Sequence, residues 1–102
     1  IINERTLSLM EPSAVIINTA RGALAGEKAL ASALNAGKLA GACLDVLASE
    51  PMRDDCPLAG AKNCIITPHV AWGAKETRER LVGIVAENLA AFLNGKPQNV
   101  IT

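Results

Sequence analysis

The sequence predicts an α/β fold, namely a partial Rossmann-type, doubly wound parallel sheet of about three strands with flanking helices. Three short apolar segments lack polar alternation, which is typical of strands in a parallel sheet. Segments with apolar residues at helical spacing lie between or after these strands. Half of the 102 residues are apolar, yet only Trp72 and Phe92 are aromatic. This composition favours alternating helices and parallel strands over an aromatic-rich β-sandwich.

The first half of the chain contains a predicted helix, a strand and a second helix, in that order. We expect a short helix over residues 3–10 with Asn3 as its N-cap, because Pro12 forbids its continuation. Residues 14–18 form an apolar run of strand length, and we expect this strand to be buried on both faces. Residues 27–36 carry apolar side chains at helical spacing and are followed by a glycine, a typical helix end.

The second half contains two further strands, a loop and a long helix. Residues 39–46 and 64–67 are predicted strands, and a proline-containing loop over residues 47–62 joins them, with at most a helical turn near Leu58. A long final helix is expected to end before Gly95. Its apolar stripe consists of Leu81, Ile84, Val85, Leu89, Phe92 and Leu93. This order of elements predicts parallel strands joined by crossover connections.

Charge, hydropathy and cysteine usage exclude several kinds of partner. Ten basic and ten acidic residues cancel without a basic stripe, so we expect no nucleic-acid partner. No apolar run reaches about 18 residues, so we expect no membrane span or membrane partner. Cys43, Cys56 and Cys64 lack the CxxC spacing, and we interpret them as buried, reduced thiols of a cytoplasmic protein. Zinc bound by Cys56, Cys64 and His69 is a weaker alternative, and we expect no metal.

Polar residues follow each of the three predicted strands. These segments are Thr19–Gly22, Asp45–Pro51 and Thr67–Trp72. In open parallel sheets, ligands bind outside the carboxyl ends of the strands. Because the carboxyl ends of parallel strands meet at one edge of the sheet, the three segments predict a single site there.

The residue types in these segments indicate chemistry on a small carboxylate. His69 is the only histidine, so any imidazole acid/base role belongs to it, the alternative being a solvated or capping histidine. Glu50 is either a solvated loop acid or a partner that fixes the ring tautomer of His69 and favours the imidazolium. Arg21 is either a salt-bridge or capping residue or a two-pronged clamp for a carboxylate. Asp45 ends a strand, where a buried acid requires a donor.

Three segments resemble the signatures of the D-2-hydroxyacid dehydrogenase family, in the family order and spacing. Residues 10–22 resemble Met-x-Pro-x-Ala-x-x-Ile-Asn-x-x-Arg-Gly. Leu44-Asp45-Val46 with Glu50-Pro51 is similar to the second signature, and Thr67-Pro68-His69-Val70-Ala71 is similar to the third. The resemblance extends from residue 1 to about residue 100, because residues 94–100 are similar to the usual tail of the family.

The resemblance implies a role for each site residue. Arg21 would bind the substrate carboxylate and polarise its keto oxygen, His69 would be the general acid in reduction and the base in oxidation, and Glu50 would hold and charge His69. Asp45 would accept a hydrogen bond from the nicotinamide carboxamide. The implied cofactor-binding residues are Thr19, Ala20, Arg21, Asp45, His69 and Ala71. The implied cofactor is NAD or NADP, the implied substrate is a 2-keto or D-2-hydroxy acid, and the implied assembly is a homodimer.

Details of the sequence narrow the resemblance. Glutamate at Glu50 disfavours the formate dehydrogenases, which are expected to have glutamine there. Trp72, three residues after His69, resembles the glycerate dehydrogenase and hydroxypyruvate reductase branch, which implies hydroxypyruvate or glyoxylate as the keto acid. Gly26 is a departure, because relatives often place aspartate before the helix, although glycine is an acceptable N-cap.

The chain has no G-x-G-x-x-G motif and no strand-end acid after one. We therefore expect residues 1–102 to be the C-terminal part of a dinucleotide-binding domain whose N-terminal half and substrate domain lie outside this chain. The isolated 102 residues are then expected to be inactive. Two alternatives remain at this stage, an NAD(H)-sensing corepressor with the same residues and an inactive remnant of the dehydrogenase. A hydrolase using Ser49 and His69 is disfavoured, because no nucleophile-elbow sequence surrounds Ser49.

Overall fold

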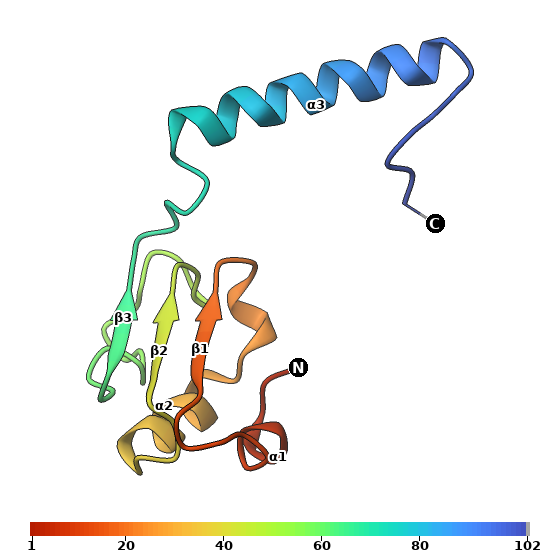
Figure 1. The fold of residues 1–102 in the computed structure, drawn as a ribbon. Coiled ribbons are helices and arrows are strands. Elements are labelled where there is room, and N and C mark those ends of the chain that lie inside the picture. The colour runs from red at the N-terminus through yellow and green to blue at the C-terminus, as the bar shows by residue number, and fades with distance from the viewer. Residues whose placement is uncertain (102) are drawn as a thin grey trace. The chain divides into compact units, whose positions relative to one another are not determined.

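The computed structural model describes residues 1–101, which form a first compact unit, Ile1–Val70, and a second unit that begins at Ala71. The first unit contains two α-helices, a short 3-10 helix and three strands (Figure 1). In chain order they are α1 (Glu4–Leu7), β1 (Val15–Asn18), the 3-10 helix Gly22–Leu24, α2 (Glu27–Asn35), β2 (Gly41–Leu44) and β3 (Cys64–Ile66).

The three strands form one parallel sheet in the order β1-β2-β3, and their arrows point the same way in Figure 1. Ile16 of β1 pairs with Ala42 of β2, which pairs with Cys64 of β3. Helix α2 lies in the connection between β1 and β2, whereas the connection between β2 and β3 contains turns and no helix among the described residues. The predicted partial Rossmann-type α/β fold is therefore confirmed, and all three strands end at the same edge.

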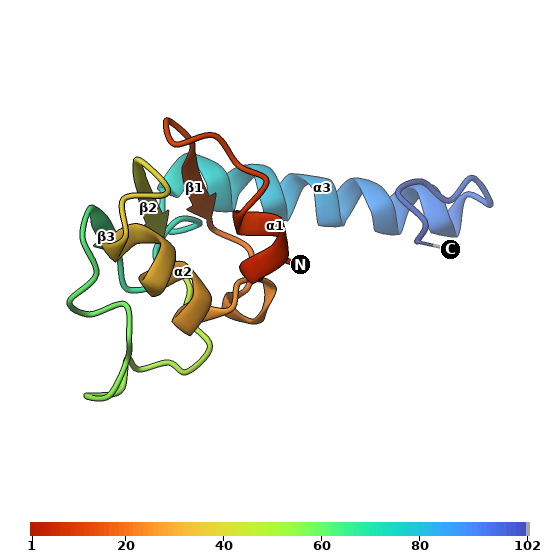
Figure 2. The same ribbon diagram turned by 90° about the horizontal axis from the view of Figure 1, so that it is seen from below.

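The hydrophobic core lies between one face of the sheet and the helices α1 and α2, which lie together in Figure 2. Leu30 and Leu34 of α2 are buried together with Ile16, Ala42 and Leu44, which occupy alternate positions of β1 and β2. The period of two along a strand sends the intervening side chains to the opposite face.

That opposite face of the sheet corrects one expectation. Val15 is 53% exposed and Ile17 is 72% exposed, and Ile65 of β3 is exposed as well. The expected burial of residues 14–18 on both faces is therefore wrong for the described chain. The β-branched residues of this segment indicate a strand, but they do not indicate which neighbouring element covers each face of it.

Several element bounds differ from the expected ones. Helix α1 begins at the predicted N-cap, where Asn3 and Thr6 form a reciprocal capping box, but it ends at Leu7 and not at residue 10. The N–H groups of Leu9 and Met10 donate to carbonyls three residues back, so the chain tightens into turns before the proline. Strand β2 is shorter than residues 39–46, because pairing to its neighbours begins only at Gly41. The 3-10 helix was not expected.

The second unit contains the long helix α3 (Lys75–Leu93), which confirms the predicted final helix. It ends at Asn94, and Gly95 follows with a left-handed φ of 68°, a conformation that glycine adopts without a Cβ clash. The apolar stripe from Leu81 to Leu93 is exposed. Within residues 1–101, no helix is long and apolar enough to cross a membrane.

We expect the 102-residue chain to self-associate at high concentration. Strand β1 is an edge strand, so its outer backbone groups have no strand partner among the described residues, and Val15 and Ile17 expose apolar surface beside this edge. Size-exclusion chromatography over a concentration series should show a size that increases with concentration. Ile17→Lys, which places a charge on the exposed face, should reduce the association. A chain that elutes as a monomer at every concentration would contradict this expectation.

Candidate active site

The loop after β1 is organised by the side chain of Asn18, the last residue of that strand. Its Nδ2 donates to the Arg21 carbonyl at 2.9 Å, and its Oδ1 accepts from the Ala20 N–H at 3.1 Å. Asparagine is suited to such turns because its side chain can bind backbone groups a few residues ahead. Asn18 thereby determines where Arg21 leaves the sheet. The sequence reasoning did not identify this role, although an asparagine before a loop is its usual signal.

The loop after β2 is held by two carboxylates. Glu27, the first residue of α2, accepts from the Ala48 N–H at 2.8 Å, and Glu50 accepts from the Leu47 N–H at 2.9 Å through Oε1. The first contact ties the loop to α2, and the second closes the loop on itself. Glu27 was also not identified from the sequence, because its partner lies 21 positions away.

The loops after β1 and β2 are in direct contact at Gly22. A Cβ at this position would lie 2.0 Å from the Leu47 carbonyl carbon and 2.4 Å from the Ala48 nitrogen, far inside van der Waals contact. Any side chain at position 22 would therefore push the two loops apart. This close approach explains why glycine follows Arg21.

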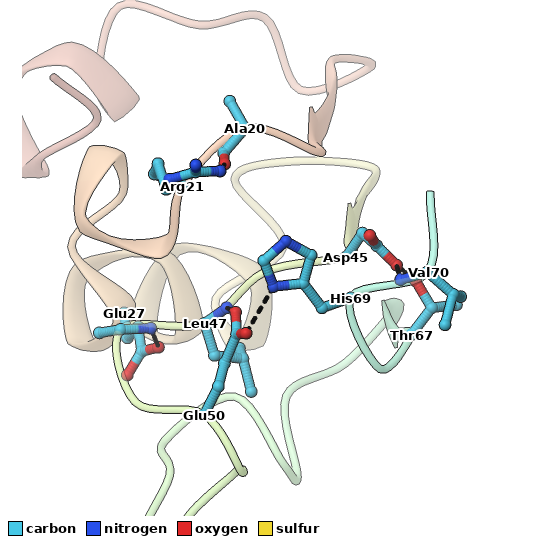
Figure 3. A network of polar contacts seen from close by, with 10 residues as sticks. Ala20, Arg21, Glu27, Asp45, Leu47, Glu50, Thr67, His69 and Val70 are labelled. Carbon is cyan, nitrogen blue, oxygen red and sulfur yellow. Dashed lines mark hydrogen bonds and ion pairs between the residues drawn. The ribbon is translucent and has the colours of Figure 1, made fainter. Parts of the chain in front are cut away.

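Glu50 and His69 form the predicted pair. The Nδ1 atom of His69 lies 2.6 Å from Oε2 of Glu50, and the two side chains are 41% and 37% exposed (Figure 3). The hydrogen bond from His69 is the largest cause that lowers the pKa of the Glu50 carboxyl, and the hydrogen bond from the Leu47 N–H lowers it further. Because Glu50 remains ionised, Nδ1 must carry the proton and donate it. The second ring nitrogen, Nε2, points away from Glu50 in Figure 3.

Asp45 fixes the loop that carries His69. It is 5% exposed, and its Oδ1 accepts from the Thr67 hydroxyl at 2.5 Å and from the Val70 N–H at 2.9 Å. The sequence reasoning expected a donor for this buried acid, and the structure provides two of them from the loop after β3. His69 lies between these donors and has a left-handed φ of 55°.

Arg21 lies on the side of His69 to which Nε2 points in Figure 3. Its Nη1 donates to the Ala20 carbonyl at 2.6 Å, and among residues 1–101 it forms no ion pair with a carboxylate. The guanidinium can therefore bind an external carboxylate. Thr19 and Ala20 are exposed at the end of β1, whereas Ala71 begins the second unit.

A cavity of about 430 Å³ adjoins the Glu50–His69 pair. Apolar side chains form most of its wall, with the carboxylate of Asp45 at one side. The wall residues are Asp45, Leu47, Glu50, Pro51, Met52, Ile66, Thr67, Pro68 and His69. The apolar wall gives the partly exposed pair one side that faces away from bulk water.

The cysteines lie apart from this chemistry. All three are free thiols, and they are half-buried and not fully buried as expected. Partial burial is the main cause that raises the pKa of Cys64, so this thiol is not an activated nucleophile. The described residues contain no group of three or more histidine, cysteine, aspartate or glutamate residues that could hold a metal ion.

Several known proteins are similar to this chain in sequence. The family model for the D-isomer specific 2-hydroxyacid dehydrogenase, NAD binding domain, matches residues 1–71. A hydroxypyruvate reductase of Blautia hydrogenotrophica is 50% identical over 101 residues, which cover 99% of this chain and 31% of that protein. A glycerate dehydrogenase of Methylorubrum extorquens is 47% identical over 102 residues, which cover 98% of this chain and 32% of that protein. The chain thus spans about a third of the length of these relatives.

Solved structures are also similar to this chain. An acyclic imino acid reductase in complex with NADPH and D-Arg superposes with a TM-score of 0.79 at 43% identity, over 97% of this chain and 31% of the other. An NADPH-dependent glyoxylate/hydroxypyruvate reductase from Sinorhizobium meliloti superposes with a TM-score of 0.70 at 38% identity, over 90% of this chain and 29% of the other.

Proposed function

Because this chain belongs to the D-isomer-specific 2-hydroxyacid dehydrogenase family, we propose that it supplies the acid/base part of an NAD(P)-dependent oxidoreductase that interconverts 2-keto and D-2-hydroxy acids. The observation that carries the proposal is the 2.6 Å contact between Glu50 and His69, with Arg21 at the same edge of the sheet. These three residues are the proposed catalytic residues.

The proposed reduction assigns one task to each catalytic residue. The Arg21 guanidinium binds the substrate carboxylate in a planar, two-pronged manner and polarises the keto oxygen. His69 donates its Nε2 proton to that oxygen, while Glu50 accepts from Nδ1 and stabilises the positive charge that the ring carries before the transfer. In the oxidation direction neutral His69 accepts the proton of the hydroxyl. The residues therefore provide placement and charge.

The residues of this chain fit the nicotinamide end of a dinucleotide. Asp45 presents a carboxylate at the end of β2, and Thr19 and Ala20 lie at the end of the neighbouring strand. These three residues would hold the nicotinamide, which supplies or accepts a hydride at the substrate C2 atom when NAD or NADP is bound. The 102 residues contain no G-x-G-x-x-G motif to bind the pyrophosphate. We therefore propose that residues 1–102 are the C-terminal part of the dinucleotide-binding domain.

The names of the relatives support a short keto acid as substrate. Similar proteins are named hydroxypyruvate reductase, glycerate dehydrogenase and glyoxylate reductase. We propose hydroxypyruvate or glyoxylate for the whole protein, in the cytoplasm and as a homodimer. The test is the oxidation of NADH and NADPH by the full-length protein with these two acids. Turnover should lie within about 1–10³ per second and should be lost in His69→Gln. Equal rates with and without His69 would overturn the proposal.

The 102-residue chain alone is expected to give no turnover with either acid. Without a pyrophosphate-binding loop, the cofactor would be held only through its nicotinamide end, and the binding energy of the remaining dinucleotide would be lost. The measurement is NADH consumption by the chain at concentrations far above those used for the full-length protein. Rates near about 1 per second would contradict the proposed division of the domain.

A further inference from the structure

We propose that Thr67 is a positioning residue, whose hydroxyl holds the carboxylate of Asp45 so that the turn carrying His69 keeps the imidazole on Glu50. The kinetic consequence rests on the proposed function, whereas the positioning itself does not. The short bond from the Thr67 hydroxyl to Asp45 is the observation from which the proposal starts.

The backbone of His69 requires external support. A φ of 55° is left-handed, and a residue with a Cβ adopts it at a cost in free energy. The two other non-glycine residues with such a φ in the described part of the chain, Asn63 and Asn99, belong to the residue type that tolerates it best. Histidine enters this region more often than most residues with a Cβ, and contacts from neighbouring groups stabilise it there. The conformation matters here because it directs the ring out of the turn and onto Glu50.

Two hydrogen bonds, one from each side of His69 in the sequence, hold this turn, and both are accepted by one carboxylate oxygen of Asp45. Oδ1 of Asp45 accepts from the Thr67 hydroxyl at 2.5 Å, two residues before His69, and from the Val70 N–H at 2.9 Å, one residue after it. Asp45 is itself buried at the end of β2, so it offers a rigid anchor. The Thr67 N–H also donates to the Leu44 carbonyl at 2.9 Å, which fixes the start of the turn.

The hydroxyl of Thr67 is the part of this support that a substitution can remove. The Val70 donor is a backbone group and is present with any residue. Without the hydroxyl, Oδ1 loses a short hydrogen bond in a buried place, which costs free energy and leaves the carboxylate less firmly held. The Val70 contact then weakens too, because it depends on the same oxygen. The left-handed turn loses support from both sides.

The ring of His69 then spends less time on Glu50. Thr67→Val keeps the shape of the side chain and removes only the hydroxyl, whereas Thr67→Ser keeps the hydroxyl. For the full-length protein we expect kcat to fall about 10- to 100-fold in Thr67→Val with KM changed little, because a misplaced acid lowers the rate of the chemical step. Thr67→Ser should recover kcat to within about threefold of the wild type.

The only histidine of the chain allows a direct test without turnover. Nitrogen-15 NMR of the imidazole in the 102-residue chain reports which ring nitrogen carries the proton when the ring is neutral. With Glu50 on Nδ1, the proton should be on Nδ1 in the wild type and in Thr67→Ser. In Thr67→Val it should move largely to Nε2, the form that a solvated imidazole prefers. Glu50→Gln serves as the reference for a ring without a charged partner.

The NMR and the kinetic measurements together distinguish the positioning role of Thr67 from the proposed function. If Thr67→Val keeps both the Nδ1 proton and the wild-type kcat, Thr67 is not a positioning residue. If the NMR result is as expected but the full-length protein turns over no keto acid, the positioning stands and the proposed function fails. Should valine unfold the chain, as circular dichroism would show, Thr67→Ala replaces it, because alanine removes the hydroxyl and is smaller than threonine.

Discussion

Replacing Gly22 with alanine is expected to reduce kcat/KM of the full-length protein by about 100-fold or more, the loss that a displacement of catalytic groups by about 1 Å can cause. The added Cβ would lie 2.0 Å from the Leu47 carbonyl carbon and 2.1 Å from its oxygen. These are backbone atoms, so no rotamer change relieves the clash, and the loops after β1 and β2 must separate. Arg21 leaves one loop and Glu50 the other, so Arg21, the proposed substrate clamp, moves away from the partner of His69.

The same substitution should destabilise the 102-residue chain by about 3 kcal/mol, the upper range for an overpacked site. Urea unfolding of the chain measures this change. Gly60→Ala is the matched control, because a Cβ there meets nothing within 4 Å and no left-handed φ is involved. This control should keep both the stability and the activity of the wild type. If Gly22→Ala also resembles the wild type, the two loops do not depend on their contact at Gly22.

The sequence was sufficient for features that follow from local patterns. Apolar runs of strand length predict the strands, and ligands bind at the carboxyl ends of parallel strands. These two points predict from the sequence that Glu50 and His69 lie at the same edge of the sheet. The capping residue Asn3 and the end of α3 before Gly95 are equally local signals, and the structure confirms both. The proposed catalytic roles, by contrast, came from the family resemblance and stay proposals.

The features that the sequence did not predict depend on the approach of distant segments. The contact of Gly22 with Leu47 and the bond from Ala48 to Glu27 join loops more than 20 residues apart. No periodicity encodes such pairs. The left-handed conformation of His69 also depends on its neighbours, because a histidine in the sequence does not by itself indicate which φ it adopts. The exposed side of β1 was misjudged because apolar composition indicates a strand but not what covers it.

Replacing Glu50 with glutamine is expected to change the pH dependence of both reaction directions. The carboxylate of Glu50 touches Nδ1 of His69 and favours the protonated ring, which keto-acid reduction requires. Glutamine keeps the shape and removes the charge, so the protonated ring loses its ionic partner. The falling limb of the proposed reduction profile should therefore move toward acid pH, and solvent screening of the partly exposed pair limits the size of this movement.

For the wild type we also expect a loss of folding stability at acid pH, when the Glu50 carboxyl is protonated. Because the pKa of Glu50 is lowered by its hydrogen bonds from His69 and Leu47, the pair should persist as pH falls through the ordinary range of glutamate. It is lost only below that range, when the carboxyl is protonated. The stability that the pair contributes is therefore present above the pKa of glutamate in the unfolded chain and lost as pH falls through the lower folded value. Glu50→Gln should lack this acid-side loss entirely.

The measurement is kcat/KM against pH in both directions for the wild type and Glu50→Gln. Oxidation requires neutral His69, so its rising limb should move toward acid pH together with the falling limb of reduction. Arg21→Lys supplies the control, because lysine keeps a charge but loses the planar two-pronged contact. Arg21→Lys should chiefly raise KM for the keto acid. In the double variant with Glu50→Gln, the falling limb of reduction and the rising limb of oxidation should still move toward acid pH. Limbs that do not move in Glu50→Gln would mean that the 2.6 Å contact carries no charge effect, and Glu50 would then be a loop acid that holds Leu47 alone.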